Sequence, residues 1–209
     1  MSPAVKVLLF DLGRVLVDFD HLRAARRLAD FCAKTPQEIY DLFFESSVTA
    51  DFEAGKISPW DFYLKVKEVL EFNLSYDSFE PIWNDIFFLS AKNRAVFGLV
   101  NTLRPHYQTA LLSNINILHY EYLVKNFPVF EAFDRIFLSF KLGLIKPDQR
   151  IYHLVARELK VEPPEIFYTD DRPELVQSAK ALGFQASIFK DYNQLLGELK
   201  LSKIGFLPA

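Results

Sequence analysis

The chain has 209 residues, half of them hydrophobic, and a formal net charge of −3 at pH 7. This composition excludes an intrinsically disordered chain, and the apolar runs fall short of the roughly 20 residues that a membrane-spanning helix needs. A single cysteine, Cys32, excludes a disulfide framework, and the four histidines show no metal-ligand spacing.

The first predicted element is a buried strand over Val7–Phe10, where four consecutive apolar residues run directly into Asp11. A carboxylate at the end of a parallel strand lies where open α/β sheets bind ligands, although a turn or helix cap is the alternative role for Asp11. Residues 21–88 then show helical periodicity without a convincing strand, which predicts an all-helical block. Its helices are expected over residues 21–33, 35–45, 58–72 and 77–87.

From residue 93 onward, helical and strand patterns alternate. Helices are expected over residues 93–104, 116–126, 148–160 and 174–182 and from about 191. Strands are expected over residues 107–113, 135–140, 166–170 and 185–189. This alternation predicts parallel βαβ units with right-handed crossovers. With Val7–Phe10, the sequence predicts an α/β fold, a Rossmann-like sheet of five parallel strands flanked by helices, with a loosely held tail over residues 201–209.

Polar side chains follow three further strands, at the same edge of the predicted sheet as Asp11. They are Ser113-Asn114, Lys146-Pro147 and Asp170-Asp171. Each pair alone is a common turn or helix entry, but together they place an acid, a hydroxyl, an ammonium and two more acids along one rim. This set suits phosphoryl transfer, because a carboxylate can attack phosphorus while the other groups bind the phosphoryl oxygens. Asp11 with a second acid also fits an oxygen-only Mg²⁺ site.

The chain resembles the haloacid dehalogenase superfamily over nearly its whole length. Four motifs of that family occur in order: FDLGRVLVD, LLSN, GLIKPDQRIY and FYTDD. The segments VDFD, FEAGKIS and SNINILH are similar to its bacterial α-D-glucose-1-phosphate phosphatase-like branch. The resemblance implies an α/β core of residues 1–16 and 91–209, and an inserted helical cap of residues 17–90.

The same resemblance implies a nucleophile and a metal site. Asp11 would be the catalytic nucleophile and a Mg²⁺ ligand. The Gly13 carbonyl and Asp171 would be further ligands, with Asp170 in support at the metal.

The resemblance also implies which residues bind the substrate. Ser113 and Lys146 would hold the phosphate, and Lys146 would take part in catalysis. Asn114 would line the side that faces the cap and the leaving group. Asn116 and His119 are weaker candidates for that side, and a buried structural histidine is the alternative for His119.

Two positions depart from the family pattern. Gly13 stands where these phosphatases usually carry an Asp that acts as general acid and base, a function worth about 10²–10⁴-fold in rate. Asp18 and Asp20 are the nearest acids in sequence. This departure predicts a slow enzyme or a substitute proton carrier, although the resembling branch carries the same glycine.

The second departure is Leu175, where the last motif usually has an Asp or Asn that supports the metal site. Loss of such support commonly costs about 10–100-fold in metal affinity or activity. The adjacent Glu174 is a candidate substitute. Arg14 and Arg172 are either ligands for the substrate anion, bridges to the acids of the site, or exposed surface arginines.

We therefore expect a Mg²⁺-dependent phosphatase that hydrolyses a small phosphomonoester, with a sugar phosphate as one candidate, through an aspartyl-phosphate. A non-catalytic ligand-binding or interaction protein is the main alternative, and a 2-haloacid dehalogenase ranks third because that chemistry needs no Mg²⁺. Residues 17–90 carry 14 acidic and 7 basic residues, whereas the remainder is net positive without a concentrated basic patch. The expected partner is thus a phosphorylated metabolite, neither nucleic acid nor membrane, for a cytoplasmic monomer or homodimer without a signal peptide.

Overall fold

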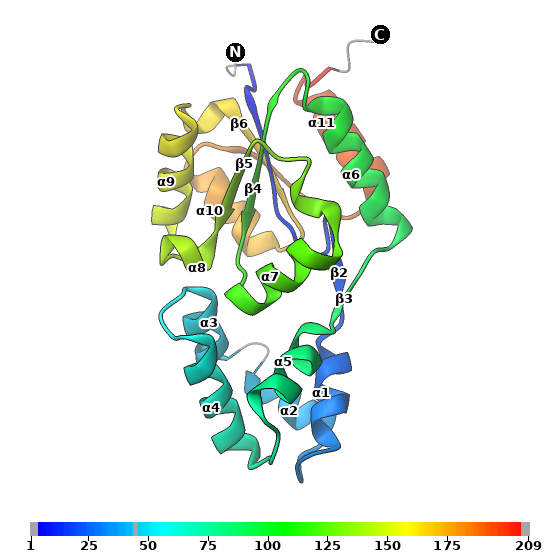
Figure 1. The fold of residues 1–209 in the computed structure, drawn as a ribbon. Helices are drawn as coiled ribbons and strands as arrows, with labels where there is room; N and C mark the ends of the chain where they lie inside the picture. The colour runs from blue at the N-terminus through cyan, green and yellow to red at the C-terminus, as the bar shows by residue number, and fades with distance from the viewer. Residues whose placement is uncertain (1–3, 44–45, 206–209) are drawn as a thin grey trace.

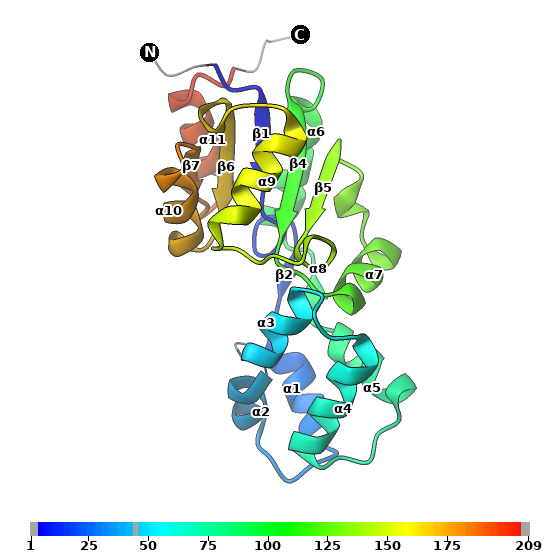
Figure 2. The same cartoon turned by 90° about the vertical axis from the view of Figure 1, so that its left-hand side faces the viewer.

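The computed structural model describes residues 4–43 and 46–205. Its central sheet has five parallel strands in the order β5-β4-β1-β6-β7. Figure 1 shows the whole fold, and Figure 2 labels all five strands. The strands are β1 (Val7–Phe10), β4 (Gln108–Ser113), β5 (Arg135–Leu138), β6 (Ile166–Asp170) and β7 (Gln185–Ile188). The central strand β1 is fully buried, as expected of a parallel strand covered on both faces. The predicted Rossmann-like α/β fold is confirmed.

Helices cover both faces of this sheet (Figures 1 and 2). One face carries α9 (Gln149–Leu159) and α10 (Pro173–Ala181), and the other carries α6 (Ala91–Leu103), α7 (Ile117–Asn126) and α11 (Tyr192–Leu201). Alternate residues of β1 point to opposite faces, so Val7 and Leu9 join the core under α9 and α10 while Leu8 and Phe10 join the other core. Short helices complete this part: η1 (Pro128–Phe130), α8 (Ser139–Leu142) and η2 (Pro163–Glu165).

Five helices form a separate layer beyond the C-terminal ends of the strands, which we call the helical unit. They are α1 (His21–Ala29), α2 (Pro36–Phe43), α3 (Ser47–Glu53), α4 (Pro59–Leu70) and α5 (Tyr76–Asn84). Aromatic rings fill its interior. The centroid of the Phe62 ring lies 4.4 Å from that of Phe52, on which it stacks, and 4.8 Å from that of Trp83, which it meets edge-to-face. The unit is joined to the sheet by two short antiparallel strands, β2 (Asp18–Phe19) and β3 (Phe87–Phe88).

The expectation that no strand interrupts residues 21–88 is wrong. Helix α5 ends at Asn84 because Asp85 leaves the helical conformation, and β3 then pairs with β2 across nearly seventy residues. Helix α3 was not predicted, and the strand expected over 135–140 ends at Leu138, where α8 takes over. The expected end of the second helix at Glu45, and residues 206–209 of the expected tail, lie outside the described residues.

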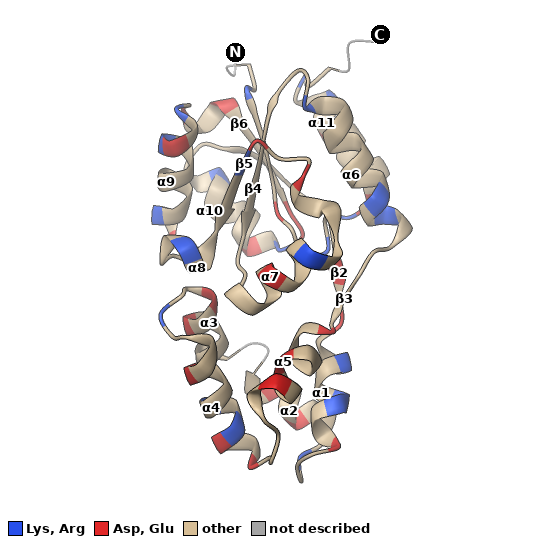
Figure 3. Cartoon of the chain, viewed as in Figure 1, with Lys and Arg blue, Asp and Glu red and all other residues tan. Residues whose placement is uncertain are grey.

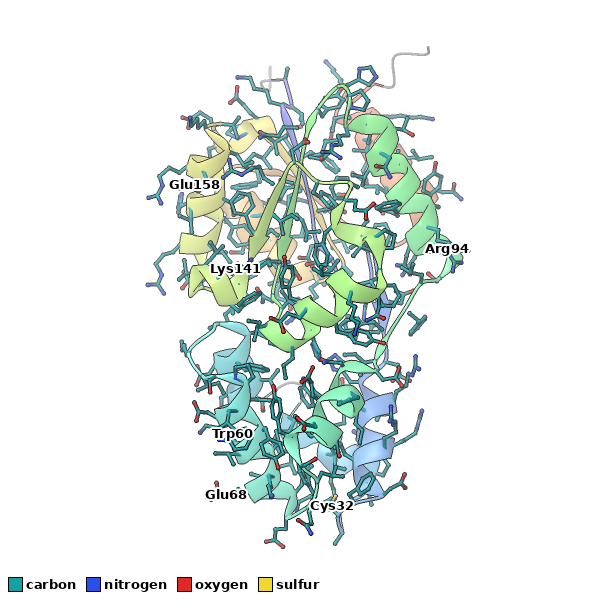
Figure 4. The ribbon with its side chains drawn as sticks, viewed as in Figure 1. Cys32, Trp60, Glu68, Arg94, Lys141 and Glu158 are labelled. Atoms are coloured by element: carbon teal, nitrogen blue, oxygen red, sulfur yellow. The ribbon has the colours of Figure 1, made fainter. Side chains whose placement is uncertain are left out.

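Lys, Arg, Asp and Glu residues occur mainly on the helices and loops of both parts (Figure 3). The single cysteine, Cys32, lies at the end of the helical unit that points away from the sheet (Figure 4). Within residues 4–43 and 46–205, none of the helices is both long and apolar enough to cross a membrane.

Candidate active site

Two acids meet at the C-terminal ends of the neighbouring strands β1 and β6. Phe10 pairs with Thr169 in the sheet, and the Asp11 N–H donates to the Thr169 carbonyl at 2.9 Å. This register places Asp11 beside Asp170, the last residue of β6. Both acids are buried, because each directly follows the buried residues of its strand.

The Lys146 ammonium lies between these two carboxylates. Its Nζ is 2.7 Å from Asp11 Oδ1 and 2.7 Å from Asp170 Oδ2. Its other acceptors are the Leu112 carbonyl and the Tyr168 hydroxyl, each at 3.1 Å. Lys146 is only 3% exposed, so its charge acts in a medium that screens it weakly.

Tyr168 is a site residue that sequence reasoning missed. Its hydroxyl donates to Asp170 Oδ2 and accepts from Lys146 Nζ. In sequence it is one more ring in a buried strand. The signal that could have found it is its spacing, because residues two apart on a strand share a face, and Tyr168 stands two residues before Asp170.

The ionisation of these groups follows from burial and from the lysine. Burial raises the pKa of Asp11 to about 7, although the Lys146 charge favours the carboxylate. Burial also opposes ionisation of Asp170, but Lys146 and the hydrogen bond from Tyr168 outweigh it and hold its pKa below the ordinary value. For Lys146 the two acids outweigh burial and raise its pKa. Lys146 and Asp170 are therefore a fixed ion pair, and Asp11 is the more readily protonated acid.

Asn114 holds the backbone of Lys146. Its Nδ2 donates to the Lys146 carbonyl at 2.9 Å, and its Oδ1 accepts from the Lys146 N–H at 2.8 Å. The Lys146-Pro147 peptide bond is cis. Ser113, at the end of β4, is buried at the same edge. The structure thus joins the loop that follows β4 to the loop that carries Lys146.

Asn116 and His119 serve to join α7 to the helical unit. Asn116 caps α7 by accepting from the His119 N–H at 3.0 Å, and its Nδ2 lies 3.1 Å from His119 Nδ1. The ring of His119 stacks on Trp83, and its Nε2 lies 3.3 Å from the Trp83 carbonyl. Burial lowers the pKa of His119 to about 3, so it is a neutral packing residue, the alternative considered for it.

Three carboxylates can converge on one cation. Asp11, Asp170 and Asp171 each offer an oxygen, and these oxygens lie within 4.8 Å of one another. Burial and the nearby Asp170 raise the pKa of Asp171, and they outweigh the opposing charges of Arg14 and Lys146. An all-oxygen donor set of this kind fits Mg²⁺. Gly13, whose carbonyl is the fourth expected ligand, lies in the same loop as Asp11.

The space beside Gly13 is filled by the ring of Phe19. A Cβ at position 13 would lie 2.9 Å from Phe19 Cε1, which is closer than real side chains approach. Phe19 is held in turn, since His21 stacks on it at 4.7 Å and the Arg14 guanidinium lies over it at 4.7 Å. Arg14 also approaches Asp171, with Nε 3.8 Å from Oδ2. The Phe19 ring on β2 therefore takes the space that a side chain at position 13 would need.

Neither residue at the Leu175 departure supports the metal site directly. Leu175 is buried in the core, where its carbonyl accepts from the Tyr152 hydroxyl at 3.1 Å. Glu174 accepts from Arg172 Nε at 2.6 Å and both side chains are largely exposed. The hydrogen bonds that hold an acid at this edge come instead from Tyr168, Lys146 and the Arg172 N–H, which all donate to Asp170.

Comparison with known proteins agrees with this geometry. The chain is 24% identical over 187 residues to a D-ribitol-5-phosphate phosphatase from Bacteroides thetaiotaomicron, covering 87% of this chain and 90% of that protein. It is 24% identical to a sesquiterpene phosphatase from Aspergillus oryzae, covering 88% and 89%. A crystal structure of a HAD family enzyme from Bacteroides thetaiotaomicron, in complex with magnesium and inorganic phosphate, superposes with a TM-score of 0.82 at 26% identity, covering 92% of this chain and 99% of that one. The family model of haloacid dehalogenase-like hydrolases matches residues 5–183, and the chain therefore belongs to that family.

Proposed function

We propose that this hydrolase is a Mg²⁺-dependent phosphatase that cleaves a small phosphomonoester through an aspartyl-phosphate on Asp11. The observation that carries the proposal is the Lys146 ammonium held at 2.7 Å from both Asp11 and Asp170, with Asp171 close by. Dehalogenation needs a nucleophilic acid but no Mg²⁺, so three carboxylates that can hold one cation favour phosphate as the substrate group. Two relatives named as phosphatases support the same class of reaction.

In the proposed reaction, Asp11 uses one carboxylate oxygen to attack phosphorus. Lys146 and the Ser113 hydroxyl bind the phosphoryl oxygens, whose charge must be balanced as the bond to the leaving group breaks. Asp11, Asp170, Asp171 and the Gly13 carbonyl would hold Mg²⁺, which when bound neutralises phosphate charge so that a carboxylate can approach a dianion. Water then attacks the aspartyl-phosphate, releases inorganic phosphate and restores Asp11.

The substrate class and the domain division belong to the same proposal. Residues 17–90 would be a cap over the strand ends, with residues 1–16 and 91–209 as the core. The relative named for D-ribitol-5-phosphate makes polyol and sugar phosphates the first compounds to test. A small substrate agrees with the closeness of the helical unit to the sheet edge, where His119 of α7 stacks on Trp83 of α5.

Turnover of p-nitrophenyl phosphate and of a panel of polyol and sugar phosphates tests the proposal. We expect activity with Mg²⁺, its loss in EDTA, and its loss in Asp11→Asn. The matched control is Asp77→Asn, because Asp77 is an exposed acid in the helical unit. Equal activity of Asp11→Asn and wild type would refute the nucleophile. Mg²⁺-dependent protection by beryllium fluoride without turnover would favour the non-catalytic alternative instead.

A further inference from the structure

Glu53, the last residue of α3, is anchored to the sheet at the edge where the active site lies. Its backbone carbonyl accepts a hydrogen bond from Ser139 Oγ at 2.6 Å. The same Ser139 Oγ accepts from the Ile115 N–H at 2.9 Å. Ile115 lies two residues beyond β4 and Ser139 directly follows β5, so α3 ends against the carboxyl ends of two strands. Figure 2 shows α3 beside α8 at this junction.

The turn after Glu53 fits closely against the sheet part of the molecule. Gly55 has a φ of +67°, and any Cβ at this position would collide with the carbonyl of Phe140. The backbone of this turn therefore touches α8 directly. A contact that requires both a glycine and a buried serine fixes where Glu53 lies relative to the site.

The Glu53 carboxyl has no hydrogen-bond or ion-pair partner among the described residues, and its residue is only partly exposed. Burial raises its pKa to about 7, against the opposing charges of Arg172 and Lys146, which are close enough to act on it. A half-buried acid that is unpaired and lies near perturbing charges is typical of a functional group.

The other acids near Gly13 are engaged elsewhere. Asp18 binds Lys92 at 3.1 Å and so fixes β2 to the start of α6. Asp20 caps α1 by accepting from the Leu22 N–H at 3.0 Å. The place of a side chain at position 13 is taken by the Phe19 ring. A substitute proton carrier would therefore come from another element.

We propose that Glu53 is the general acid and base of this site, supplied by the helical unit in place of a residue at position 13. The inference rests on the proposed phosphatase function. As Asp11 attacks phosphorus, the bond from phosphorus to the leaving oxygen breaks, and that oxygen takes the electron pair together with the proton of the Glu53 carboxyl. The resulting Glu53 carboxylate then takes a proton from the water that attacks the aspartyl-phosphate. The bond from phosphorus to Asp11 breaks, and protonated Glu53, the Asp11 carboxylate and inorganic phosphate remain.

Comparing leaving groups in Glu53→Gln tests this role. An alkyl phosphate such as ribitol 5-phosphate needs a proton on its leaving oxygen, whereas p-nitrophenolate leaves without one. We expect kcat/KM of the variant to fall about 10²–10⁴-fold for the alkyl phosphate and far less for p-nitrophenyl phosphate. Because dephosphorylation of Asp11 also loses its base, the variant should release a burst of about one p-nitrophenolate per site, then slow turnover.

The controls distinguish a failure of the proton-transfer role of Glu53 from a failure of the proposed phosphatase function. Asp51→Asn, in the same helix at an exposed ion pair with Lys56, should leave both substrates unaffected. Glu53→Ala should regain alkyl phosphatase activity with added formate. Equal losses for both substrates in Glu53→Gln, without a burst, would overturn the proton-transfer role and leave only binding. Absence of any Mg²⁺-dependent turnover in the wild type would instead overturn the proposed function itself.

Discussion

Replacing Lys146 by methionine tests whether the lysine is what makes the acid cluster stable. Each carboxylate at 2.7 Å from Nζ contributes about 6 kcal/mol of gross attraction at an effective dielectric constant of about 20. Desolvation of the three charges offsets much of this attraction. Removing one partner of a buried pair commonly costs about 3–5 kcal/mol, because the remaining charges stay buried and uncompensated. We expect a loss of this size in the free energy of unfolding.

The loss should depend on pH and on metal. Without Lys146, the pKa values of Asp11 and Asp170 rise above their unfolded values, so the penalty is largest near pH 8 and shrinks as falling pH protonates the acids. Mg²⁺ should stabilise the variant more than the wild type, since the ammonium no longer competes for the same oxygens. Urea unfolding in EDTA and in Mg²⁺ measures both effects, with the exposed Lys65→Met as control. A variant within about 1 kcal/mol of wild type at pH 8 in EDTA would refute the reasoning.

Three further predictions concern neighbouring positions. Gly13→Ala should lower the free energy of unfolding by about 1–3 kcal/mol, because the new Cβ would collide with the Phe19 ring. In a Phe19→Ala background the same substitution should be nearly neutral, and equal effects in both backgrounds would contradict this explanation. Tyr168→Phe removes the hydroxyl bound to Asp170 and should weaken Mg²⁺ binding about 10–100-fold, measured by calorimetry, whereas unchanged affinity would exclude that supporting role. The raised pKa of Glu53 means that metal-free wild-type stability is lost as pH rises from its unfolded value of 4.5 through about 7. In EDTA, Glu53→Gln should therefore exceed wild type by up to about 3 kcal/mol near pH 8 and match it below pH 5; a constant difference would argue against a buried titrating group.

The sheet, and the grouping of the candidate site residues at one edge of it, could be predicted because their signals are local. Strand β1 runs directly into Asp11 and β6 ends at Asp170, and parallel pairing then brings the two acids together. Lys146 joins the two acids because its loop, which comes after β5 and α8, lies at the same edge of the sheet. These inferences need only strand periodicity and the rule that ligands bind at carboxyl ends.

Other features depend on contacts between distant segments, which leave little local trace. Strand β3 consists of two residues and exists because Phe88 pairs with Asp18. The filling of the space at Gly13 by Phe19, and the hydroxyl of Tyr168, are invisible to patterns that score these rings as apolar. The surroundings of Glu53 arise only when the end of α3 contacts Ser139, and in the sequence Glu53 is an ordinary acid on a helix surface.

The pairing of β2 with β3 also has a consequence for how such proteins diversify. The helical unit leaves and rejoins the sheet part at the same place, since Phe19 pairs with Phe87 and the Asp20 N–H donates to the Ile86 carbonyl at 2.9 Å. An insertion with adjacent ends can be lengthened, shortened or exchanged as one contiguous block without shifting the register of the strands around it. Recombination at this pair of strands would transfer a complete substrate-facing module, including its own proton carrier, onto an unchanged nucleophile.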